Sequence, residues 1–192
     1  AIASICEGKT GYTDSAGIGP AREAVARYIS RTREIRATPD HVVIGNGSKH
    51  FIAFVILCTT DFGAGDEVIY PNPGYPIYES QIIANGAVPV ALPLTEETRF
   101  RFRIEELEKR ITSRTKLLIL NTPQNPTGGV LEQNDLIAIA ELVKKYDLWV
   151  LADEIYCQII YEKKFESIVS LPGMYERTII CDGLSKAYAM TG

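Results

Sequence analysis

Short apolar runs alternate with helical patterns along this chain, and no other feature restricts its fold as strongly. The runs are apolar throughout, as strands covered on both faces are, and they lie at His41–Ile44, Glu67–Tyr70, Ala87–Leu92, Lys116–Asn121, Leu148–Ala152 and Thr178–Cys181. Helical spacing recurs at Pro20–Thr32, Ser48–Thr59, Tyr75–Ala84, Arg103–Ile111 and Gln133–Tyr146. Because strands that alternate with helices pair in parallel, the sequence predicts a three-layer α/β/α fold with a mostly parallel (mixed) sheet.

The chain length fits one domain. Its 192 residues contain no internal repeat and no low-complexity linker, so we expect a single domain over residues 1–192. The chain begins AIASICEGKTG, without an initiator methionine or a signal peptide, and it stops at Met190-Thr191-Gly192 within an expected loop. We therefore expect that both ends are cut from a longer chain.

Charge and composition argue against several classes of protein. A net charge of −4 gives no basic footprint for nucleic acid. The longest apolar run, Phe51–Cys58, is far too short to span a membrane. The two histidines and four widely spaced cysteines form no metal-ligand pattern. Buried, reduced thiols in a cytoplasmic protein are the simplest interpretation of those cysteines.

Glycine and polar residues concentrate just after the expected strands. These segments are Gly45–Ser48, Pro71–Tyr75, Asn121–Gly129, Asp153–Tyr156 and Asp182–Lys186. In open parallel sheets the ligand binds beyond the carboxyl ends of the strands. The pattern therefore predicts a ligand pocket at this edge of the sheet.

The turn Gly45-Asn46-Gly47-Ser48-Lys49 leads into an expected helix. Backbone N–H groups at the positive end of a helix dipole suit a phosphate. The glycine spacing matches neither a nucleotide P-loop nor a dinucleotide fingerprint, because His50 stands where a third glycine is needed. A tight turn with Ser48 as an N-cap explains the segment equally well.

Asp153 and Lys186 each follow an apolar strand. A carboxylate at the end of a buried strand needs a cation or a hydrogen-bond donor, and a protonated pyridine nitrogen would serve. A lysine near buried surface can act as an amine nucleophile toward a carbonyl group. Taken alone, Asp153 is better explained as a helix or turn cap, and Lys186 as a surface lysine.

The loop Asn121–Gly129 contains two prolines and two glycines, which demand a specific backbone path. Asn125-Pro126 within it is a candidate cis peptide bond.

These segments together resemble the class I/II aminotransferases, which are fold-type I pyridoxal-phosphate-dependent enzymes. The resemblance covers nearly the whole chain, and its motifs follow the order of the family. They are Gly11-Tyr12-Thr13-Asp14-Ser15-Ala16-Gly17, Gly45–Lys49, Tyr70–Pro76, Asn121–Gly129, Asp153–Tyr156 and Ser185–Gly192. The resemblance implies the large domain of such an enzyme, with pyridoxal 5'-phosphate as cofactor.

The resemblance also implies catalytic roles for three residues. Lys186 would be the Schiff-base lysine and the proton shuttle, Asp153 would pair with the pyridinium nitrogen, and Tyr75 would stack on the cofactor ring. Asn125 and Tyr156 would hydrogen-bond the phenolic oxygen of the ring and favour its ionised form.

The phosphate ligands implied by the resemblance are the turn at Gly47, the backbone N–H groups of Ser48 and Lys49, and the Ser185 hydroxyl. Tyr12 would reach the phosphate of a neighbouring subunit, which implies a homodimer.

The chain departs from the family pattern in three ways. Gly183 stands where many relatives carry a serine, which puts one phosphate ligand in doubt. The phosphate-binding arginine of the family follows the Met-Thr-Gly motif, at which this chain ends. The arginine that binds the substrate carboxylate belongs to a C-terminal small domain, which we expect to be absent.

Three functional hypotheses remain open from the sequence. The first is a transferase that moves an amino group between an amino acid and a 2-oxo acid. The second is a lyase or ring-forming synthase with the same core, although the Asn-Pro-Gly-Tyr-Pro loop favours an aminotransferase. The third is a cofactor-binding fragment without catalysis of its own. No metal site is expected, and the amino donor is not specified by these residues.

Overall fold

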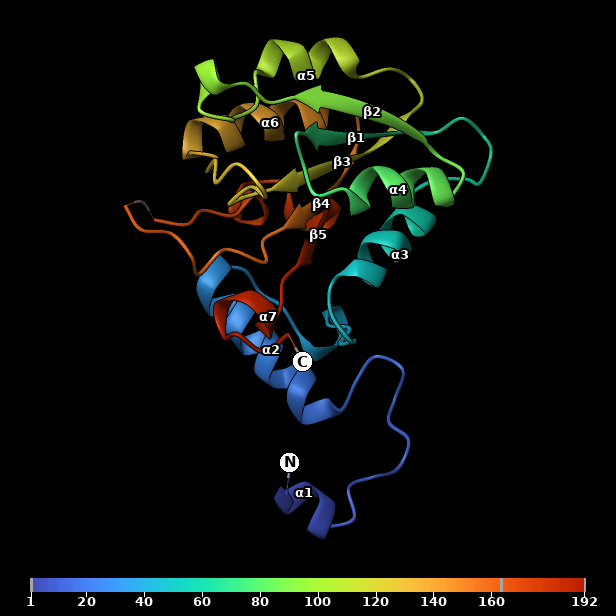
Figure 1. Cartoon of the computed structure of the whole chain (residues 1–192), viewed down its shortest axis with the longest axis vertical. Coiled ribbons are helices and arrows are strands. Elements are labelled where there is room, and N and C mark those ends of the chain that lie inside the picture. The colour runs from blue at the N-terminus through green and yellow to red at the C-terminus, as the bar shows by residue number, and fades with distance from the viewer. Residues whose placement is uncertain (1, 163, 192) are drawn as a thin grey trace. The chain divides into compact units, whose positions relative to one another are not determined.

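The computed structural model describes residues 2–162 and 164–191 (Figure 1). The chain divides into two compact units, an N-terminal unit of residues 1–46 and a sheet unit of residues 47–192.

The N-terminal unit contains the helices α1 (Ile2–Cys6) and α2 (Gly19–Arg33) and the short 3-10 helix η1 (Pro39–His41). Pro20 lies in the first turn of α2, where its missing N–H breaks no helical hydrogen bond. Arg22 of α2 donates through Nε to the carbonyl of Pro39, at 3.0 Å, and to that of Val42, at 3.1 Å. These bonds hold the segment after α2 against the helix.

The predicted strand at His41–Ile44 is wrong. His41 ends η1, and the Ile44 N–H donates to the carbonyl of Ala16 in a loop, at 2.9 Å. A strand needs a neighbouring ladder for its backbone groups, and an apolar run alone does not provide one. Among the described residues, this segment pairs with no strand.

The described residues of the sheet unit form five strands, which confirm the predicted α/β class. They are β1 (Glu67–Asn72), β2 (Val88–Pro93), β3 (Thr115–Asn121), β4 (Trp149–Asp153) and β5 (Thr178–Cys181). Their order is β2-β1-β3-β4-β5, and every described pairing is parallel. The other five predicted strands therefore form within two residues of their expected bounds.

The helices of this unit are α3 (Lys49–Thr59), α4 (Ile77–Ala84), α5 (Ile104–Arg110), α6 (Gln133–Lys145) and α7 (Leu184–Ala187), with 3-10 helices η2 (Glu96–Thr98), η3 (Ile168–Ser170) and η4 (Tyr175–Arg177). Alternate residues of the strands point to two separate apolar clusters. Leu118 and Leu120 pack with α5 and α6, whereas Leu117 and Ile119 pack with α3 and α4. Helices therefore cover both faces of the sheet, as Figure 1 shows, and form the predicted three layers.

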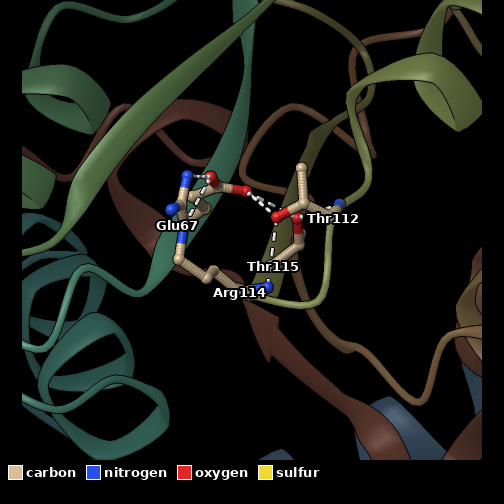
Figure 2. Close-up of polar contacts among 4 residues, drawn as sticks. All are labelled: Glu67, Thr112, Arg114 and Thr115. Carbon is tan, nitrogen blue, oxygen red and sulfur yellow. Dashed lines mark hydrogen bonds and ion pairs between the residues drawn. The ribbon is translucent and has the colours of Figure 1, made fainter.

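A buried carboxylate holds the amino-terminal edge of the sheet together (Figure 2). Glu67, the first residue of β1, is 4% exposed. Its Oε1 accepts hydrogen bonds from Nε and Nη2 of Arg114, at 3.1 and 2.7 Å. Its Oε2 accepts from the hydroxyls of Thr112 and Thr115, at 2.6 and 3.1 Å. Burial raises the pKa of Glu67, but these bonds and the Arg114 charge outweigh that effect and leave the pKa below its usual value.

None of the four cysteines forms a disulfide within the described residues. Cys157 and Cys181 are buried, as expected, but the expectation is wrong for Cys6 and Cys58, which are exposed. Cys6 lies on α1, which has no buried residue, and Cys58 lies on α3 next to the exposed Leu57. No helix formed by the described residues has the length and apolar character needed to cross a bilayer.

Candidate functional site

The carboxyl ends of the central strands meet at one edge of the sheet. In the strand register, Asn121 at the end of β3 lies opposite Asp153 at the end of β4, and Asp153 lies opposite Cys181 at the end of β5. This arrangement brings together the polar segments that follow those strands in the sequence. Two hollows elsewhere on the surface, one along α2 and one near Thr112 and Tyr146, contain none of the predicted site residues.

Asp153 is a buried carboxylate at this edge, with 3% of its surface exposed. Its Oδ2 accepts a 2.6 Å hydrogen bond from the hydroxyl of Tyr78, and its Oδ1 accepts a 3.3 Å bond from the N–H of Ile155. Burial raises the pKa of Asp153, and the charge of Asp182 adds to this, although the two hydrogen bonds act in the opposite direction. No ion pair joins Asp153 to a cation among the described residues.

Tyr78 was not predicted from the sequence. It lies on α4 and is fully buried, and burial together with the neighbouring Asp153 charge raises its pKa well above the usual value. Its ring meets that of Tyr75 edge to face, with centroids 5.7 Å apart and planes at 89°. The only sequence signal is an aromatic residue three positions after Tyr75, which is also what a core tyrosine would give.

The loop after β3 is held by Asn121. This residue is 2% exposed, and its Nδ2 donates to the carbonyl of Asp153 at 3.0 Å. Its Oδ1 accepts from the N–H of Asn125 at 2.8 Å. Asn125 is half-buried and precedes Pro126 through a cis bond, which confirms that expectation. The bonds Asn72-Pro73 and Thr122-Pro123 are also cis.

The turn predicted to bind phosphate lies directly before α3. Gly47 has φ +83°, a left-handed conformation that favours glycine, and a Cβ at this position would meet no atom within 4 Å. Ser48 occupies the N-cap position of α3, but its side chain makes no capping hydrogen bond. The Sγ of Cys181 lies 4.0 Å from the carbonyl oxygen of Ser48, which places this turn beside the end of β5.

The remaining predicted residues of the sheet unit lie on the segments after β4 and β5. Tyr156 is half-buried, three residues beyond Asp153. Ser185 and Lys186 both lie on the short helix α7, where Ser185 is half-buried and Lys186 is exposed. Gly183 before them has φ 175°, which any residue adopts, but a Cβ there would lie 3.3 Å from Cδ1 of Ile155.

Tyr12 belongs to the N-terminal unit, and its side chain is fully exposed. Its predicted reach to the phosphate of a neighbouring subunit stays a prediction. Lys49, the first residue of α3, is also exposed. Within the described part of the chain, no group of three or more histidine, cysteine, aspartate or glutamate residues could hold a metal ion.

Comparison with known proteins places these residues in a family. The family model described as aminotransferase class I and II matches residues 2–192. An aspartate aminotransferase of Pyrococcus abyssi is 40% identical over 96% of this chain and 48% of its own length. An aromatic-amino-acid aminotransferase of Thermococcus litoralis is 41% identical over 97% of this chain and 48% of its own. The crystal structure of an aromatic aminotransferase from Pyrococcus horikoshii superposes with a TM-score of 0.96 at 37% identity, over 100% of this chain and 51% of the other. The chain thus spans about half the length of these relatives.

Proposed function

The chain belongs to the aminotransferase class I and II family, and we propose that its protein transfers an amino group between an amino acid and a 2-oxo acid. The family uses pyridoxal 5'-phosphate as cofactor. The observation that carries the proposal is the buried carboxylate of Asp153 at the carboxyl edge of the sheet.

The surroundings of Asp153 fit a protonated pyridine nitrogen. Its two oxygens accept one described hydrogen bond each, from Tyr78 and Ile155, and a carboxylate can accept about four. A buried carboxylate without a cation is costly, and this is why burial raises the pKa of Asp153. A bound pyridinium would supply the missing charge, and Asp153 would in return keep the ring nitrogen protonated.

Tyr75, Asn125 and Tyr156 would orient the ring. All three are half-buried and lie on the segments that follow β1, β3 and β4. The ring of Tyr75 is set at right angles to that of Tyr78, and its face would stack on the cofactor. The side chains of Asn125 and Tyr156 would donate hydrogen bonds to the phenolic oxygen and stabilise its ionised form.

The phosphate would bind at the turn that begins α3. The open space at Gly47 leaves room for an anion, and the N–H groups of Ser48 and Lys49 start the helix. The hydroxyl of Ser185 on α7 would be a further ligand, and its contribution would matter more because Gly183 offers no side chain.

Lys186 would bind the cofactor covalently through Nζ. Pyridoxal phosphate, when bound, supplies an electron sink that stabilises negative charge on the α-carbon of the amino acid. The amine of Lys186, when free, would accept the α-carbon proton of the amino acid and would donate it back during the transfer. Asp153 would hold the proton on the ring nitrogen throughout.

We also propose that residues 1–192 form the large domain of a longer cytoplasmic chain, which acts as a homodimer and binds neither nucleic acid nor a membrane. Phe54, Leu57 and Phe62 of the sheet unit are exposed, and association between two copies is one way in which such apolar side chains would be covered. The exposed Tyr12 would then reach the partner's phosphate. Sedimentation velocity over a range of concentrations would test the oligomeric state.

The cofactor assignment is tested by adding pyridoxal phosphate to the purified chain and recording the visible spectrum. Reduction with borohydride followed by peptide mass spectrometry would then locate any adduct. We expect a shifted cofactor band and a modified peptide that carries Lys186. The variant Lys186→Ala should give neither, whereas Lys164→Ala should behave as the unmodified chain.

An adduct on another lysine, or none on a chain shown to be folded by circular dichroism, would contradict the assignment of Lys186. Transaminase activity is a separate measurement. It would be made with several amino acids and 2-oxo acids on the full-length protein, because this chain spans only about half of its relatives.

A further inference from the structure

Two buried side-chain amides connect the segments that carry the candidate site. Asn121 joins the loop after β3 to the end of β4, through its bonds to the Asn125 N–H and the Asp153 carbonyl. Gln124, which is 5% exposed, donates through Nε2 to the carbonyl of Pro73 at 2.8 Å. That bond joins the loop after β3 to the loop after β1, two residues before Tyr75.

The backbone around Gln124 makes this connection rigid. Its N–H donates to the carbonyl of Gly129 and its carbonyl accepts from the N–H of Gly128, both at 2.8 Å. Its Oε1 accepts from the N–H of Thr127 at 3.0 Å and from the Thr127 hydroxyl. The loop is therefore closed on itself, and the free end of the amide is directed to Pro73.

Each amide uses both its donor and its acceptor. A carboxylate of the same shape has no donor, and an apolar side chain has neither group. Because both residues are buried, a lost partner would not be replaced freely by water, and the loop would shift to satisfy the remaining groups. The chemistry of the contacts therefore requires amides at 121 and 124.

We propose that Asn121 and Gln124 are positioning residues that fix Tyr75, Asn125 and Asp153 in one arrangement around the cofactor. The proposal rests on the proposed function, since these three residues are its cofactor contacts. It goes beyond that function in assigning roles to two side chains that would not touch the cofactor. Pre-organised contacts are sensitive to small displacements, so the effect on binding should be large compared with the effect on folding.

The test compares the isosteric variants Asn121→Asp and Gln124→Glu with Asn85→Asp. Asn85 is a matched control, because its Nδ2 also donates to a backbone carbonyl, that of Gln81 at 2.8 Å, but at the end of α4. The dissociation constant of pyridoxal phosphate would be measured by titration for each chain. We expect it to rise ~10- to 100-fold in the two site variants and to stay within twofold in the control.

Amide hydrogen exchange without cofactor gives a second, independent readout. In Asn121→Asp the carboxylate still accepts from the Asn125 N–H but repels the Asp153 carbonyl, which also accepts from the Thr122 N–H at 3.3 Å. The repulsion should move the loop away from β4, so exchange at Thr122 and Asn125 should accelerate. Exchange at these amides should be unchanged in Asn85→Asp. Unchanged cofactor affinity in both site variants, at whatever loss of stability, would overturn the proposal.

The two readouts separate this proposal from the proposed function. If the unmodified chain binds no pyridoxal phosphate, the proposed function fails. Faster exchange at Asn125 would then still show that Asn121 holds the loop, and unchanged exchange would refute both ideas.

Discussion

The hydroxyl of Tyr78 donates a 2.6 Å hydrogen bond to Oδ2 of Asp153, across 75 residues of sequence and inside the apolar layer between α4 and the sheet. This hydrogen bond is one of two that the buried carboxylate of Asp153 accepts from the described residues. It lowers the pKa of Asp153, whereas burial raises it. Tyr78 therefore favours the ionised form of Asp153, which is the form that a pyridinium needs.

The variant Tyr78→Phe should have a lower free energy of unfolding than the unmodified chain at neutral pH. Loss of a donor to a buried charged group costs about 1–3 kcal/mol. The loss should be smaller at acid pH, because protonated Asp153 depends less on the hydroxyl. Urea unfolding at neutral and at acid pH would measure this loss. Tyr161→Phe is the control, since Tyr161 is 92% exposed. Equal stability of the two variants at neutral pH would show that the bond contributes nothing.

The variant Asp153→Asn should make the chain without cofactor more stable. The folded-state pKa of Asp153 is raised, so its stability contribution is complete below about pH 3.8, the unfolded value, and is lost as pH rises through the folded pKa. Asparagine does not ionise and keeps that stability. Above the folded pKa we expect a higher melting temperature than that of the unmodified chain, by ~2–4 °C for each kcal/mol gained in a chain of this size.

The same variant should bind pyridoxal phosphate at least ~10-fold more weakly, because a charge-assisted bond to the ring nitrogen is lost. Melting curves from acid to neutral pH and a cofactor titration would be compared with those of Asp14→Asn, which changes an exposed residue. A stability gain that is the same at every pH would contradict the ionisation argument.

The sheet was predictable because its signal is local. The strands β1 to β4 each place apolar side chains in both clusters, as with Leu117 and Leu118 of β3, whereas β5 contributes Ile179 and Cys181 to one cluster only. The segment His41–Ile44 is a similar apolar run, but a strand also needs a neighbouring strand to pair with, and an apolar run does not predict one. Helix α4 begins two residues later than predicted, because Tyr75 and Pro76 precede it.

Only part of the candidate site could be predicted from the sequence, because sequence patterns are local and some contacts of the site are not. Asp153 is a candidate because it ends a buried strand, and Asn125 because its motif resembles that of the family; both roles stay predictions. Tyr78 and Asn121 act through contacts that depend on the three-dimensional arrangement. In the sequence, Tyr78 is an aromatic residue in an expected helix and Asn121 is a polar residue at the end of an expected strand. Neither pattern predicts which residue the side chain contacts.

The variant Glu67→Gln should lose stability at neutral pH but not in acid. Glu67 has a lowered pKa in the folded chain, so its contribution is present above the unfolded value of about 4.5 and is lost as pH falls through the folded pKa. Four hydrogen bonds from Arg114, Thr112 and Thr115 depend on its two oxygens (Figure 2). We expect a loss of about 1–3 kcal/mol at pH 7.

The side chain of Arg114 is 65% exposed, so solvent screens its charge and the threonine hydroxyls should account for much of the effect. Glu141→Gln is the control, because Glu141 is 68% exposed in its ion pair with Lys144 and should change stability by less than about 0.5 kcal/mol. Urea unfolding from pH 7 to pH 3 should show the two variants converging. A constant difference over that range would show that Glu67 ionisation has no part in it.

The variant Gly74→Ala should disturb the loop that carries Tyr75. A Cβ on Gly74 would lie 2.1 Å from the carbonyl oxygen of Pro71, which is backbone and cannot rotate away. Relief of such a clash requires the loop to move, at a cost of about 1–3 kcal/mol. Because Gln124 also binds this loop, through the Pro73 carbonyl, the shift should reach the site and weaken cofactor binding. Gly11→Ala is the control, since a Cβ there meets no atom within 4 Å. If Gly74→Ala kept the stability and the cofactor affinity of the unmodified chain, the loop would accommodate the Cβ without a loss of free energy.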